Sequence, residues 1–84
     1  MEERRIGSME GRHVKGARAM LGLSQTELCK AAGINRQTLM DIERDAGDPK
    51  RSSLRAVEDA LAQHGARFSD DGREISVAVP KDAR

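Results

Sequence analysis

The feature that most constrains this chain is a pair of short helix patterns joined at a single glycine, in "LSQTELCKAAGINRQTLMDIER" at residues 23–44. Ser24 and Glu27 form a capping-box pattern, which predicts that a helix starts at Ser24. Gly33 tolerates a positive φ and ends that helix after about two turns. Because the next helix begins at once, the two helices must cross steeply and in close contact.

The second of these helices has an apolar face and a polar face. Asn35 is a suitable N-cap, and Leu39 and Ile42 recur at helical spacing, which predicts that both point inward. A close crossing requires a small side chain on the first helix, where Cys29 lies, and an apolar residue in the turn, where Ile34 lies. This spacing is typical of a DNA-reading helix-turn-helix.

Another helix pattern precedes this segment. It is expected to start at Ser8 or just after it and to end at Gly22. Gly11 and Gly16 each lower the stability of such a helix by up to ~1 kcal/mol where they are exposed in its interior. The sequence therefore predicts a first helix with two weak positions.

The segment after the helix-turn-helix predicts one more helix and then an extended run. Asp48 as N-cap and Pro49 in the first turn favour a helix start, and Gly65 favours its end. From residue 66 the pattern alternates with period two around a "DDG" turn, which predicts a hairpin-like arrangement. A lone two-stranded hairpin is marginally stable in water, so these strands need another surface to lie on.

Charge is unevenly distributed along the 84 residues. The formal net charge is +1, yet residues 12–55 contain nine Lys or Arg against five Asp or Glu. Residues 56–84 contain four Lys or Arg against six Asp or Glu. The basic excess therefore lies in the middle of the chain, where it forms either a nucleic-acid-binding surface or an ordinary solvated one.

The residue types argue against several other classes of protein. Cys29 is the single cysteine, so it forms no internal disulfide and fits a reducing cytoplasm. His13 and His64 are too isolated to be metal ligands. No apolar run suits a signal peptide or a membrane span, and no nucleophile, base and oxyanion donor come together. We therefore expect a cytoplasmic protein that is not an enzyme and needs no cofactor, metal or small-molecule ligand.

The same segment carries a family resemblance. "LGLSQTELCKAAGINRQTLMDIER" resembles the helix-turn-helix of the phage-repressor/Cro (XRE) family of bacterial and phage regulators, and the match extends through "DPKRSSLRAVEDALAQHG". It covers residues 12–65, about two-thirds of the chain. The resemblance implies an all-α, lambda-repressor-like bundle of four to five helices, with a short C-terminal β-strand or hairpin. Departures from the family pattern are Cys29 in place of alanine, Arg51 in place of an apolar residue, and the acidic Asp41.

The expected DNA contacts fall into two groups. The second helix of the pair, which begins at Asn35, is called the reading helix here. Because Leu39 and Ile42 face inward, its outer face carries the candidate base-reading residues Arg36, Gln37, Met40 and Asp41, with Asn35 at its tip. Arg36 suits guanine O6 and N7, and Gln37 suits adenine N6 and N7. Asp41 can accept from cytosine N4 or orient Arg36 or Arg44. The candidate phosphate contacts are Gln25, Arg44, Lys50, Arg51, Ser52, Lys15 and Arg12. Ordinary solvated residues are the alternative at each position.

Two structural roles complete the expectations. The resemblance implies a partly buried ion pair between Arg18 and Glu43 that fixes the tilt of the reading helix. One reading helix covers only a few base pairs, so a homodimer on a roughly palindromic operator is expected. The candidate dimer contacts are Leu54, Val57, Leu61, Phe68, Ile75, Val77 and Val79.

Two functions from different classes remain open. The first is a transcriptional regulator that binds double-stranded DNA in association with the bacterial nucleoid, with repression as its default output and activation from an adjacent site as the alternative. The second is a protein-interaction module of antitoxin or anti-activator type, and a protein partner could also modulate DNA binding. The expected organisation is a flexible arm at 1–8, a DNA-binding domain at 9–65, a dimerisation segment at 66–79 and a tail at 80–84.

Overall fold

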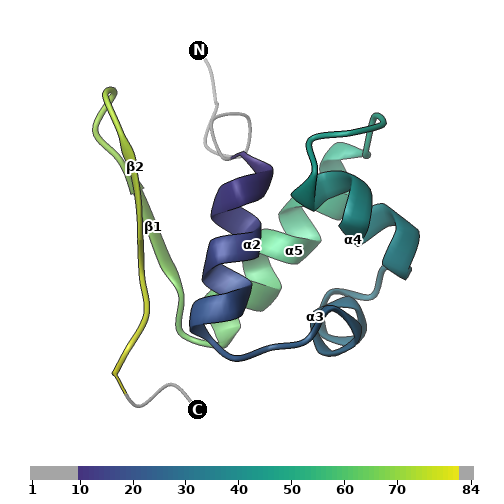
Figure 1. Cartoon of the computed structure of the whole chain (residues 1–84), viewed down its shortest axis with the longest axis horizontal. Coiled ribbons are helices and arrows are strands. Elements are labelled where there is room, and N and C mark those ends of the chain that lie inside the picture. The colour runs from purple at the N-terminus through teal and green to yellow at the C-terminus, as the bar shows by residue number, and fades with distance from the viewer. Residues whose placement is uncertain (1–9, 82–84) are drawn as a thin grey trace.

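The computed structural model describes residues 10–81 of the chain (Figure 1). Within this range it contains four helices and one two-stranded antiparallel hairpin, as the sequence predicted. The expected arm at 1–8 and the last three residues of the expected tail lie outside the described residues. No helix in the described range has the length and apolar character needed to span a membrane. The elements are α2 (Gly11–Met20), α3 (Gln25–Ala32), α4 (Arg36–Glu43), α5 (Arg51–Gln63), β1 (Arg67–Asp70) and β2 (Ile75–Ala78).

The hydrophobic core lies among the four helices. Leu28 of α3, Leu39 of α4 and Leu61 of α5 are fully buried, and Val14 of α2 is buried beside them. Full burial of each large aliphatic side chain contributes about 1.5–3 kcal/mol to stability. Ile42 is buried too, so the predicted inward face of α4 is confirmed.

The helix-turn-helix forms as its capping residues predict. The Glu27 N–H donates to Ser24 Oγ at 3.0 Å, and the Ser24 N–H donates to Glu27 Oε1 at 2.8 Å. Gly33 ends α3 with a φ of 71°, and the Thr38 N–H donates to Asn35 Oδ1 at 2.8 Å. These local bonds satisfy helix-end groups that would otherwise lack partners. They therefore define both ends of the turn.

The start of α2 shows a role for Gly11 that the sequence did not predict. Gly11 is buried, and a side chain at this position would collide with the carbonyl oxygens of Ile42 and Glu43 at the end of α4. The Gly11 N–H also donates to Asp45 Oδ1 at 2.9 Å. Gly11 therefore allows two backbones to meet, whereas Gly16 has open space around its Cα.

The predicted start of α5 is wrong by two residues. The N-cap is Lys50 rather than Asp48, and the helix begins at Arg51 instead of including Pro49 in its first turn. Lys50 has an extended backbone, with a ψ of 149°, so helical geometry cannot begin before it. Its side chain makes no capping hydrogen bond. The predicted end is confirmed, because His64 caps the helix and Gly65 follows with a φ of 108°.

The C-terminal hairpin packs along α2, and Figure 1 shows it on the opposite side of α2 from α4. Phe68 pairs with Val77, and both side chains are half-buried against the helical core, as is Val79. The residues between them on β2 are exposed, so the period-two pattern is confirmed for β2, whereas β1 ends with two exposed residues in a row. In the turn, the backbone N–H groups of Arg73 and Glu74 hold the pKa of the Asp71 carboxyl below its ordinary value.

Two predicted dimer contacts are corrected by this packing. Val57 and Leu61 have 0% exposed surface, because they fill the protomer's own core. They present nothing to a second copy. Leu54 is half-buried against the same core. Val57 and Leu61 therefore serve the fold of a single chain, whereas Leu54 keeps some exposed surface.

Candidate nucleic-acid interface

The outer face of α4 carries polar groups that point away from the core. Arg36 and Gln37 are exposed, and Met40 and Asp41 are partly exposed. The Gln37 Nε2 donates to Asp41 Oδ1 at 3.0 Å, and Arg44 Nη2 lies 3.7 Å from the same oxygen. Asp41 thus orients Gln37 and Arg44, which explains how an acidic residue fits on this face.

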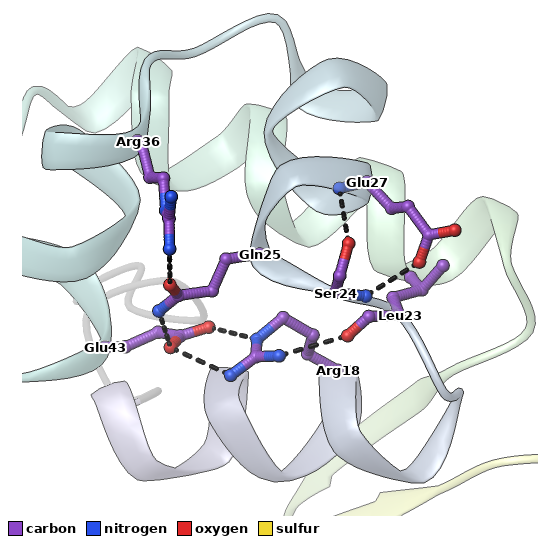
Figure 2. Close-up of polar contacts among 7 residues, drawn as sticks. All are labelled: Arg18, Leu23, Ser24, Gln25, Glu27, Arg36 and Glu43. Atoms are coloured by element: carbon purple, nitrogen blue, oxygen red, sulfur yellow. Dashed lines mark hydrogen bonds and ion pairs between the residues drawn. The ribbon is translucent and has the colours of Figure 1, made fainter.

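Arg36 is oriented from a different helix. Its Nη2 donates to Gln25 Oε1 at 3.4 Å, and the Gln25 Nε2 in turn donates to Glu43 Oε1 at 3.2 Å (Figure 2). The prediction that Asp41 could orient Arg36 is therefore wrong, because the acceptor for Arg36 is Gln25 at the start of α3. The structure brings the predicted phosphate contact Gln25 next to a predicted base-reading residue.

The expected ion pair between Arg18 and Glu43 is present. Arg18 Nε lies 2.6 Å from Glu43 Oε2, and its Nη2 donates to Glu43 Oε1 at 3.3 Å. The Arg18 side chain is 15% exposed and that of Glu43 only 3%. Arg18 Nη1 also donates to the Leu23 carbonyl at 3.0 Å. As Figure 2 shows, these bonds join α2, the turn before α3 and the end of α4.

The crossing of α3 and α4 depends on a small buried residue. Cys29 is 7% exposed, and burial raises the pKa of its thiol, against the opposing influence of the Arg36 guanidinium. A thiol with a raised pKa remains protonated near neutral pH and behaves as a small apolar group. Cys29 therefore fills the position where the family pattern usually has alanine.

The candidate phosphate-binding groups come from α2, the start of α3, the end of α4 and the start of α5. Figure 1 shows α3 on one side of α4 and the loop leading to α5 on the other. At the start of α3, the backbone N–H groups of Gln25 and Thr26 have no partner within the helix, so they are suited to an anion. Arg12 on α2 is exposed and pairs with Glu10 at 2.8 Å. The remaining candidates are exposed as well: Lys15, Arg44, Lys50, Arg51 and Ser52.

Sequence reasoning missed the residues that hold the C-terminal end of α4. Asp45 adopts a positive φ of 54° just after the helix and accepts the bond from Gly11 described above. Asp tolerates this backbone conformation better than most residues, so the "RDAGD" segment did carry a weak signal. The partner of Asp45 lies far away in the sequence, and no local pattern identifies it.

Comparison with known proteins agrees with this geometry. A helix-turn-helix family model matches residues 14–64. The immunity repressor protein of Bacillus phage phi105 is 41% identical over 51 residues, which is 61% of this chain and 35% of that relative. The chain therefore spans about a third of the length of the relative it matches. Together with the outward face of α4, these matches place the chain in the phage-repressor/Cro (XRE) family of helix-turn-helix, DNA-binding transcription regulators.

Proposed function

We propose that this protein is a sequence-specific repressor that binds a roughly palindromic operator as a homodimer. The observation that carries the proposal is the outer face of α4, where Arg36 and Gln37 are exposed and Arg36 is hydrogen-bonded to Gln25 at the N-terminus of α3. Such a face can enter the major groove while the α3 N-terminus meets a phosphate. Activation from a site adjacent to a promoter is the alternative output of the same binding.

The proposed base contacts follow from the donors and acceptors that α4 presents. Arg36 would bond guanine, Gln37 would bond adenine, and Met40 would contact a thymine methyl. Asp41 would hold Gln37 in place or accept from cytosine N4. Asn35 already uses its side-chain oxygen to cap α4, so its NH₂ group is the part that would face DNA.

The proposed dimer contact is the C-terminal hairpin. Within the described residues, β1 and β2 pair only with each other, so each strand has an open edge. Exposed strand edges favour pairing with another chain, and a two-stranded sheet gains stability from added strands. A two-fold dimer of this kind would read half-sites about 34 Å apart on one face of the DNA. The apolar residues of this contact would be Phe68, Ile75, Val77 and Val79.

The Arg36→Ala variant tests the base contact. We expect the discrimination at one operator position to fall by about 5- to 150-fold, because a bidentate arginine–guanine contact contributes about 1–3 kcal/mol of discrimination. Binding to random DNA should change far less. The operator would be selected from randomised DNA, and affinities measured by gel shift on singly substituted operators. Lys30→Ala, which removes an exposed charge from α3, is the matched control. Unaltered discrimination in the Arg36 variant would rule out this contact.

The salt dependence of Lys50→Ala tests the phosphate contacts and the alternative function together. A protein that neutralises several phosphates loses affinity steeply as salt rises, and removing one contact should lower the log–log slope by about one. Lys81→Ala, an exposed position outside both strands, should leave the slope unchanged. If the wild-type protein binds no DNA at low salt, the protein-interaction module becomes the better explanation.

A further inference from the structure

Gln25 occupies a position that requires a side chain able both to donate and to accept a hydrogen bond. On one side it meets the Glu43 carboxylate, which only accepts hydrogen bonds when ionised, and on the other the Arg36 guanidinium, which only donates. A carboxamide donates through its NH₂ and accepts through its oxygen, so it bonds both. The two neighbours also decide its orientation: the NH₂ must face Glu43 and the oxygen must face Arg36.

The far end of this chain of bonds is held rigidly. Glu43 is 3% exposed, and its carboxylate receives two bonds from Arg18 in addition to the one from Gln25. Arg36, in contrast, is an exposed side chain with many rotamers to lose on binding DNA. Within residues 10–81, Gln25 is the hydrogen-bond partner that the structure gives Arg36. A buried, immobile group is thus connected through one amide to a mobile one at the surface.

We propose that Glu43 is a positioning residue for DNA reading: through the amide of Gln25 it holds the Arg36 guanidinium in the direction of the major groove. This inference rests on the proposed function and adds a role for a residue that contacts no DNA. The core ion pair therefore sets base discrimination as well as the tilt of α4. Preorganising Arg36 lowers the entropic cost of the guanine contact, and a misplaced guanidinium loses that contact selectively.

The test separates this positioning role from simple support of the fold. Two double variants replace the ion pair by neutral side chains, Arg18→Met with Glu43→Leu and Arg18→Met with Glu43→Gln. Neutral replacement of a buried ion pair is often tolerated, so both proteins should fold. The Glu43→Gln change keeps a carbonyl acceptor for the Gln25 NH₂, whereas Glu43→Leu removes it. Thermal unfolding is measured first, so that the two variants are compared as folded proteins.

The readout is the pattern of affinities across singly substituted operators. We expect the Glu43→Leu double variant to lose about tenfold in discrimination at the base that Arg36 reads, as an unpositioned arginine contact should. The Glu43→Gln double variant should stay close to the wild type. Equal discrimination in both double variants would overturn the positioning role and leave the regulator proposal intact. A wild type that does not discriminate at all would overturn the proposed function and this inference with it.

A second comparison decides the matter if a double variant does not fold. Gln25→Leu leaves the Arg18–Glu43 pair in place and removes the amide bridge. If Gln25 only contacts a phosphate, this change weakens binding uniformly on all operators. If it positions Arg36, discrimination at one base is lost too, and that extra loss disappears in the Arg36→Ala background. Additive effects of the two substitutions would overturn the inference.

Discussion

The Gly11→Ala variant should be destabilised by about 3 kcal/mol, the upper part of the range for overpacked positions. The added methyl group would collide with the carbonyl oxygens of Ile42 and Glu43, which are backbone atoms and cannot rotate away. Relief requires α2 and α4 to separate, which also weakens the bond between the Gly11 N–H and Asp45. For a domain of this size, the melting temperature should fall by roughly 12–24 °C.

The same helix contains the control for this prediction. Apart from its own stretch of helix, Gly16 has no atom within 4 Å of where a side chain would begin. Gly16→Ala should therefore stabilise the protein by about 0.5–1 kcal/mol, since alanine is the better helix former. Both variants would be measured by urea and thermal unfolding, followed by circular dichroism. Similar shifts in the two variants would show that the contact between α2 and α4 gives way easily.

Removal of one partner of the Arg18–Glu43 pair should cost about 3–5 kcal/mol, because the remaining charge is left buried without its partner. Arg18→Met should be the more damaging change. It leaves the less exposed group, Glu43, unpaired, and it also removes the bond to the Leu23 carbonyl. In Glu43→Leu, the Arg18 guanidinium keeps that bond to Leu23 and some access to water.

A double-mutant cycle in urea measures this coupling directly. The variant carrying both Arg18→Met and Glu43→Leu should recover most of the loss and lie within about 2 kcal/mol of the wild type, as neutral replacements of buried ion pairs often do. Single and double effects that simply add would contradict the interpretation. In that case the pair would contribute no more than an exposed ion pair does.

The helix-turn-helix was predictable because its determinants are local. Ser24 caps α3 through its exchange with Glu27, Asn35 caps α4 through its bond from Thr38, and Gly33 ends α3 because it tolerates a positive φ. Each of these interactions joins residues within three positions of each other, so a short stretch of sequence is enough to predict them. The apolar spacing of α4 then decided which side of it faces the core, and with it the identity of the outward residues.

Contacts between distant segments were not predictable in this way. Gly11 appeared as a weak helix position, but it is needed because it contacts the backbone at the end of α4 and bonds Asp45, 34 residues away. The apolar pattern of α5 showed that Val57 has to be covered, but not that the same chain covers it completely. The bond from Gln25 to Glu43 likewise joins residues 18 positions apart. Periodicity identifies a face, and only the folded chain shows what lies against it.

Because α4 has a buried face and an exposed face, its outward residues could change during evolution, and with them the DNA sequence that the protein recognises. Gln37 and Met40 contribute little to the core, so mutation can explore them while the protein remains folded. Arg36 is different, because its side chain is hydrogen-bonded to Gln25 on another helix. Under the proposed function, a substitution at position 36 that changes recognition also removes this hydrogen bond, so positions 25 and 36 are expected to change together.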